Sequence, residues 1–165
     1  MKKRKKQEKR SYVKHPRYGS EPIPSNNQIP VHAIICGHWS YDNVRFFPET
    51  AIVADTSKQN YAIYPRTIYV DIEERCRTCH RYFIFFAREQ RFWFEELGFW
   101  VDAQCTQCIE CRKKEQEIRW MQKRYQQLTE KTDRKKSESR ELKQIAMELF
   151  QLGYIRDENK LRVGV

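Results

Sequence analysis

The sequence lacks the long apolar stretches and the short motifs by which membrane proteins and many enzymes are recognised. No segment approaches the roughly 20 consecutive apolar residues that a membrane-spanning helix needs, so we expect no membrane protein. There is no Gly-rich phosphate-binding loop, no H-E-x-x-H helix and no nucleophile with a base beside it. The sequence therefore predicts a protein that is not an enzyme and that has no small-molecule substrate.

An apolar segment is also missing from the start of the chain, which reads Met-Lys-Lys-Arg-Lys-Lys. A secretory signal peptide needs such a segment, so we expect a cytoplasmic protein. Thiols stay reduced in the cytosol, and the six cysteines are therefore not expected to form disulfides. They are better candidates for binding a metal.

Five of the six cysteines lie between Cys76 and Cys111. Two C-x-x-C units separated by a short folded insert are typical of a four-cysteine site for one structural Zn²⁺, because each unit turns two thiolates toward one ion. Cys76 and Cys79 form the first unit. The second is ambiguous, because Cys105, Cys108 and Cys111 make two overlapping C-x-x-C units.

The segment that follows favours one of these two choices. From Ile109 to about Leu128 there is no Gly or Pro and there are many Lys, Glu, Gln and Arg, which predicts a helix. Cys108 would then lie at the N-cap and Cys111 in the first turn, where the positive end of the helix dipole stabilises thiolates. The preferred zinc ligands are Cys76, Cys79, Cys108 and Cys111, and the alternative uses Cys105 in place of Cys111.

The residues around the cysteines resemble those of a known family. The sequence has Tyr69-Val70-Asp71 before the first C-x-x-C unit, Glu89-Gln90-x-x-Trp93-x-Glu95 in the insert, and Cys108-x-x-Cys111-Arg112 at the end. This pattern resembles a family of small, mostly bacterial, uncharacterised "probable zinc-ribbon" proteins of treble-clef type, over residues 51–114 or so. The resemblance implies zinc binding and no established activity. The chain departs from the family at His80, where the family usually has Gly, and at the extra thiol of Cys105.

The expected fold is a small α+β module of treble-clef or zinc-ribbon type, stabilised by zinc, with an extended N-terminal strap and C-terminal helices. We expect four segments: a disordered basic arm over 1–20, an extended Pro-containing strap over 21–50, the zinc module with its long following helix over 51–128, and a polar linker, second helix and tail over 129–165. Ser137 or Ser139 is expected to cap the second helix, and Gly153 to end it. We expect its apolar stripe to pack within the chain, as a helical hairpin.

A second metal site is conceivable at His32, Cys36 and His38. Their spacing is irregular and a fourth ligand is missing. We instead expect Cys36 to be a small buried residue and both histidines to be partly exposed.

The uneven distribution of charge along the chain is the sequence feature that points to a particular function. Residues 1–20 hold nine Lys and Arg and one Glu, a net charge of +8, whereas the other 145 residues hold 23 Lys and Arg and 21 Asp and Glu. Such an arm can contact the phosphates of RNA or DNA without reading bases. We therefore expect a nucleic-acid or ribonucleoprotein accessory. The candidate contacts are Lys2, Lys3, Arg4, Lys5, Lys6, Lys9 and Arg10.

Two other functions stay open. A protein-interaction adaptor could use the C-terminal helices or the aromatic insert as its docking face. More remotely, Cys105 could move in and out of zinc coordination and act as a redox-sensing thiol.

Overall fold

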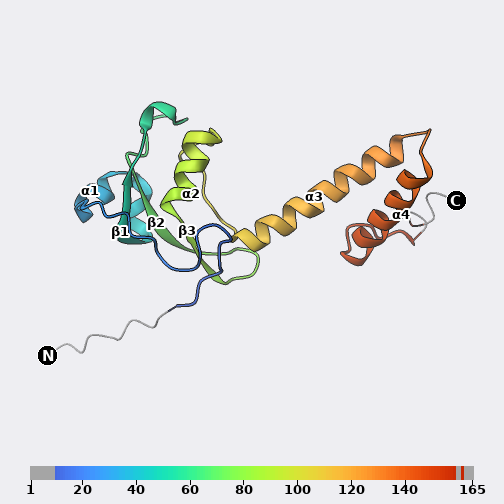
Figure 1. The fold of residues 1–165 in the computed structure, drawn as a ribbon, viewed down its shortest axis with the longest axis horizontal. Coiled ribbons are helices and arrows are strands. Elements are labelled where there is room, and N and C mark those ends of the chain that lie inside the picture. Colours follow the sequence, from blue (N-terminus) through green and yellow to red (C-terminus); the bar gives the residue numbers. More distant parts are fainter. Residues whose placement is uncertain (1–9, 159–160, 162–165) are drawn as a thin grey trace. The chain divides into compact units, whose positions relative to one another are not determined.

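The computed structural model describes residues 10–158 and residue 161 (Figure 1). All the predicted nucleic-acid contacts except Arg10 therefore lie outside the described residues. The chain divides into two compact units, one that extends to Cys111 and one that begins at Arg112. No helix in the described part of the chain is long and apolar enough to cross a membrane.

A three-stranded antiparallel sheet forms the centre of the first unit (Figure 1). Its strands are β1 (Arg45–Val53), β2 (Ile68–Arg75) and β3 (Tyr82–Phe85), in the order β1-β2-β3. The register between β1 and β2 shifts between Phe47 and Ile52. Thr50 holds this bulge, because its hydroxyl donates to Phe47 O at 2.7 Å and accepts from Asp71 N at 2.8 Å. The bulge accommodates Pro48, which has no N–H to donate to the ladder.

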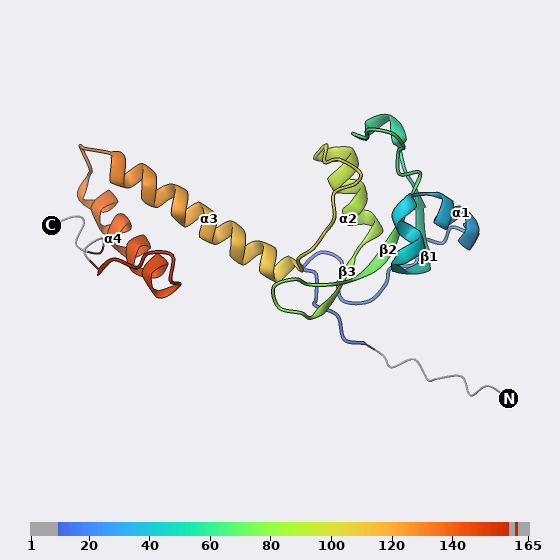
Figure 2. The same ribbon diagram turned by 180° about the vertical axis from the view of Figure 1, so that it is seen from behind.

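The central strand separates two apolar clusters, because successive side chains of a strand point to opposite faces. Ile68, Val70 and Ile72 pack in one cluster with Ile34 of α1 (Val31–Cys36). Tyr69 packs in the other with Ala87 of α2 (Ala87–Arg91) and with Phe94 of the following π-helical turn η3 (Phe92–Glu96). Figure 2 shows α1 and α2 on either side of the strands.

Two segments differ from the sequence prediction. Residues 10–20 are not a disordered arm: Val13 is buried and donates its N–H to Tyr82 O at 2.9 Å. The predicted strap over 21–50 is extended in its first part but then forms α1, a 3₁₀ turn η1 (Trp39–Asn43) and most of β1. The run Val31–Cys36 is short, and periodicity cannot distinguish a helix from a strand over so few residues.

Asp71 joins three parts of the first unit. Its buried carboxylate accepts hydrogen bonds from Ile23 N at 2.9 Å and from Ala87 N at 2.6 Å. The second bond satisfies a donor at the start of α2 that has no partner within the helix. Burial raises the pKa of Asp71 to about 6, although the two backbone donors act to lower it.

The second unit is a helical hairpin. It contains most of α3 (Ile109–Glu130) and all of α4 (Lys136–Gln151), which confirms the helix predicted from Ile109. Arg124 and Glu141 link the two helices through two hydrogen bonds of 2.7 and 2.8 Å. The hairpin packs within the chain, around a cluster of Leu128, Leu142, Ile145, Ala146, Leu149 and Ile155.

The ends of α4 are only partly as expected. Neither Ser137 nor Ser139 caps the helix; Glu138 instead accepts a bond from Lys135 N at 2.9 Å. A carboxylate at this position of the first turn satisfies the N–H of the N-cap residue and also complements the helix dipole. Gly153 follows the helix with a φ of +79°, as predicted for a terminating glycine.

We predict that Asp71 makes the stability of the first unit depend on pH. The folded pKa of about 6 lies above the ordinary value of 3.8, so this contribution is present below pH 3.8 and is lost as the pH rises through 6. As the pH rises from 4 to 7, the unfolding free energy of the wild type should therefore fall by about 1–3 kcal/mol relative to that of Asp71→Asn, whatever the difference between the two proteins at pH 4. Urea unfolding of the zinc-loaded proteins measures this difference. Asp42→Asn at an exposed site is the control, and equal pH profiles for both variants would contradict the prediction.

Candidate metal centre

The first pair of candidate ligands lies in the turn between β2 and β3. Cys76 directly follows β2, and its N–H donates to Arg81 O at 3.0 Å, while His80 N donates to Cys76 O at 2.9 Å. These bonds close a tight turn that also carries Cys79. His80 completes the turn with a φ of +60°, which lies in the left-handed region of backbone conformation that residues other than Gly rarely adopt. This positive φ explains why a glycine would suit the position, as it does in the family that the sequence resembles.

The second pair lies at the start of α3. Cys108 immediately precedes the helix and Cys111 lies in its first turn. Two hydrogen bonds fix this segment to the first turn: Arg77 N donates to Thr106 O at 2.9 Å, and Gln107 Nε2 donates to Thr78 Oγ1 at 3.0 Å. The two turns are therefore held together by contacts that do not involve the sulfur atoms.

Four sulfur atoms converge between the two turns. The Sγ atoms of Cys76, Cys79, Cys108 and Cys111 all lie within 4.8 Å of one another, and those of Cys79 and Cys108 are 3.8 Å apart. A tetrahedral zinc ion with Zn–S bonds of about 2.3 Å requires sulfur atoms about 3.8 Å apart. The geometry therefore fits a single Zn²⁺ ion, which these four cysteines could hold.

The protein environment favours ionisation of the first pair. Burial acts to raise the pKa of Cys76, but the backbone amides of Cys79, Cys108 and Thr78 lower it to about 6. The backbone amide of Arg81 lowers the pKa of Cys79. Amides directed at sulfur are what a C-x-x-C turn supplies to a metal thiolate.

Burial raises the pKa of Cys108, and burial together with the neighbouring thiols raises that of Cys111 to about 12. Four thiolates crowded together repel one another, so the group cannot ionise fully by itself. A bound Zn²⁺ supplies the positive charge that keeps all four deprotonated. Arg81 is paired with Glu110 and also interacts with the Cys79 sulfur, and these two partners, the carboxylate first, raise the pKa of its guanidinium. No sequence pattern around Arg81 predicts this contact.

The other candidate ligands lie elsewhere. Cys105 is buried outside the group of four, and its Sγ contacts Gln107 O at 3.5 Å. Among the described residues, His32, Cys36 and His38 form no metal-binding group. The exposures expected for them were wrong in part: Cys36 is exposed, and His38 is buried. Burial, and then the nearby Arg66, lower the pKa of His38 to about 4, so it is a neutral core residue.

Comparison with known proteins supports the assignment. Residues 70–119 match the model of a family described as "Probable treble clef domain". The match begins in β2 and ends within α3, so it contains all four clustered cysteines. No curated protein and no solved structure gives a significant match. The chain thus contains a treble clef zinc-binding domain of α+β type.

We predict one zinc ion per chain, held by the four clustered cysteines. Cys111→Ser should weaken zinc binding at least about 100-fold, because metal binding and folding are coupled and a serine hydroxyl is a poor substitute for a thiolate. Cys105→Ser should keep one zinc ion with little change in affinity. Native mass spectrometry and competition with a chelating dye measure the two effects. Loss of zinc from Cys105→Ser with retention in Cys111→Ser would instead support the alternative ligand set.

We further predict that His80 is strained. His80→Val should lower the unfolding free energy by about 1–2 kcal/mol, because a β-branched residue is poorly tolerated at positive φ. His80→Gly should equal or exceed the wild type. Arg77→Val is the matched control, because Arg77 lies in the same turn, is exposed and has no positive φ. Equal losses from the two valine substitutions in urea unfolding of zinc-loaded protein would show that the turn is unstrained.

Proposed function

We propose that the treble clef zinc-binding domain at residues 70–119 is the rigid platform of a non-enzymatic, cytoplasmic protein that contacts RNA or DNA through its basic N-terminal arm. Four cysteine ligands fill the coordination sphere of zinc, which leaves no position at which the metal could activate water. The zinc therefore has a structural role in this proposal.

The observation that carries the proposal is the concentration of +8 of the net charge of +10 in the first 20 residues. Arg10, the last of the candidate contacts, anchors the end of the arm. Its guanidinium pairs with Glu73 and lies over the ring of Tyr82, 4.4 Å from the ring centre. Arg10 is thus engaged within the protein, which leaves the contact with phosphate to the residues before it.

The anchor places Arg10 beside the first cysteine turn, because Tyr82 is the first residue of β3. Arg75, Arg77 and Arg81 in and around this turn are exposed. Arg81 is paired with Glu110, whereas Arg77 makes no side-chain hydrogen bond or ion pair within the described residues. Arg77 is therefore a further positive charge that a phosphate backbone could meet next to the arm.

We predict binding of single-stranded RNA or duplex DNA that weakens steeply as salt rises from 50 to 200 mM or so. Replacement of Lys2, Lys3, Lys5 and Lys6 by Gln should flatten the slope of log K against log salt by up to about 3, because each phosphate contact releases about 0.7–0.9 counterions. Fluorescence anisotropy measures this slope. The matched control replaces Lys113, Lys114, Lys123 and Lys143, all exposed, and has the same net charge.

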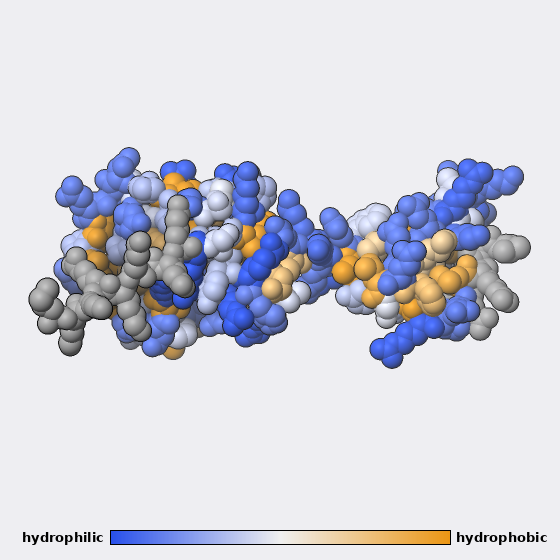
Figure 3. Space-filling model, turned by 90° about the horizontal axis from the view of Figure 1, so that it is seen from below, coloured by the Kyte–Doolittle hydropathy of each residue, from blue (hydrophilic) through white to orange (hydrophobic). Residues whose placement is uncertain are grey.

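A specific observation favours an adaptor for proteins as the second candidate function. The hairpin carries a groove of about 360 Å³ with Trp120, 59% exposed, in its wall. Figure 3 shows apolar side chains gathered on one face of this unit. Glu117, Glu141 and Glu148 line the groove and no Lys or Arg does. Glu141 is paired with Arg124, so Glu117 and Glu148 supply the charge that favours a basic peptide and disfavours nucleic acid.

The two functions are distinguishable in one set of measurements. If the arm variant binds nucleic acid as well as the wild type does, the first proposal fails. A protein partner that is recovered after nuclease treatment and lost on Trp120→Ala would then establish the adaptor function. The redox-sensor alternative gains no support, because a buried thiol such as that of Cys105 is poorly accessible to oxidants.

A further inference from the structure

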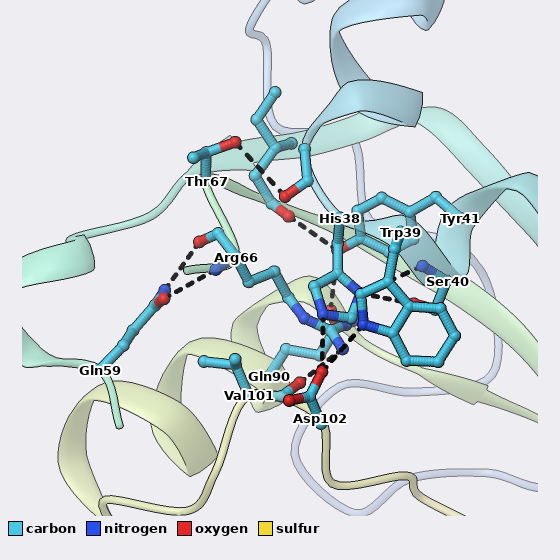
Figure 4. A network of polar contacts seen from close by, with 12 residues as sticks. His38, Trp39, Ser40, Tyr41, Gln59, Arg66, Thr67, Gln90, Val101 and Asp102 are labelled. Atoms are coloured by element: carbon cyan, nitrogen blue, oxygen red, sulfur yellow. Dashed lines mark hydrogen bonds and ion pairs between the residues drawn. The ribbon is translucent and has the colours of Figure 1, made fainter. Parts of the chain in front are cut away.

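Arg66 is a buried cation at the centre of the first unit. It precedes β2, and it is only 4% exposed. Its Nη2 donates to Val101 O at 2.7 Å, and its Nη1 makes a long bond of 3.4 Å to Gln90 Oε1 (Figure 4). The guanidinium also lies over the rings of Tyr41 and Phe94, with 5.4 and 5.0 Å to the ring centres. All of these partners are neutral.

Arg66 has no acidic partner in the described part of the chain, because no carboxylate oxygen there lies within 4 Å of its guanidinium. Its Nε is buried and has no hydrogen-bond acceptor. Asp102 is engaged elsewhere: its Oδ1 accepts from Trp39 Nε1 at 2.9 Å and lies 3.3 Å from His38 Nε2 (Figure 4). A buried charge is costly unless it is paired, so an Arg without a counter-charge indicates a missing anion.

A cavity of about 230 Å³ adjoins Arg66. Val44, Ile72 and Phe85 form apolar walls, and Gln104 and Glu74 contribute polar groups. Gln104 is exposed, and its side chain makes no hydrogen bond within the described residues, so its amide is available as a donor. The cavity thus combines apolar walls with a buried guanidinium that lacks a charged partner and with a second donor, as small-molecule sites commonly do.

We propose that this cavity binds a small, singly charged carboxylate, whose oxygens accept hydrogen bonds from Arg66 and Gln104. The planar guanidinium suits a planar carboxylate, and its charge compensates the ligand's. The Glu74 carboxyl group in the wall repels a doubly charged anion such as phosphate more strongly than a singly charged carboxylate, because repulsion scales with the ligand's charge. Within the part of the chain that the structure describes, none of the four clustered cysteines and no residue of the basic arm lines this cavity.

Binding would brace the segment that leads to the second cysteine pair. Arg66 already holds Val101 O, and the cavity is lined by Ala103, Gln104 and Cys105. An anion that bridges Arg66 and Gln104 would therefore tie this segment to the start of β2. A ligand that binds the folded state stabilises it in proportion to the logarithm of its concentration above Kd.

The test is a titration of the zinc-loaded full chain with sodium acetate, at ionic strength held constant with sodium chloride, followed by NMR of the arginine Nε–H groups. We expect the Arg66 Nε–H signal to shift with saturation in the millimolar range. Arg66→Lys keeps the charge but loses the fork of donors, and should weaken binding at least about 10-fold. Arg91→Lys is the control, because Arg91 also donates to a backbone carbonyl, Val53 O at 2.8 Å, but is exposed.

A shift of the Arg66 signal that stays linear in acetate, or saturable binding that survives in Arg66→Lys, would overturn the proposal. If Arg66→Lys does not fold, the wild-type signal alone decides. Sodium phosphate in a parallel titration tests the choice of ligand. Saturation by phosphate without a response to acetate would refute the carboxylate assignment.

Discussion

The convergence of four cysteine sulfurs on one point is the constraint on which the first unit depends. One pair comes from the turn between β2 and β3 and the other from the start of α3. Each of these two segments is only a few residues long and can bury little apolar surface by itself. Metal binding energy supplies what such short elements lack, because a zinc site is worth about 10–16 kcal/mol in small zinc domains. The hydrogen bonds from Arg77 to Thr106 and from Gln107 to Thr78 bring the two turns together, so that the ion meets a largely preformed site.

The buried polar residues of this unit fall into two kinds. Asp71 has two backbone donors for its carboxylate and so joins the N-terminal segment, β2 and α2. Arg66 has only neutral acceptors and ring faces around its guanidinium. The first is satisfied within the fold, whereas the second leaves a charge that the described chain does not balance. This difference is why a ligand is inferred at Arg66 and not at Asp71.

The features that were predictable from the sequence are those that local chemistry determines. The spacing of the cysteines and the absence of Gly and Pro after Ile109 are sufficient to predict the zinc-binding group and α3. The helix at Val31–Cys36 and the order of residues 10–20 were not predictable in this way, because both depend on the sheet against which they lie. The burial of His38 and Arg66 likewise depends on Val101 and Asp102, which are distant in sequence from both. An isolated arginine gives no local signal that it will be enclosed.

The helix α3 belongs to both units, and this has a consequence for a cell that is short of metal. Two zinc ligands lie at its start, whereas its contribution to the hairpin core is made by Met121, Tyr125 and Leu128, about three to five turns further along. Loss of zinc would therefore release the head of the protein without removing any contact from the hairpin. The hairpin, whose core contains no zinc ligand, should therefore keep its packing when the metal is removed, whereas the first unit loses the ion that ties its cysteine turn to α3.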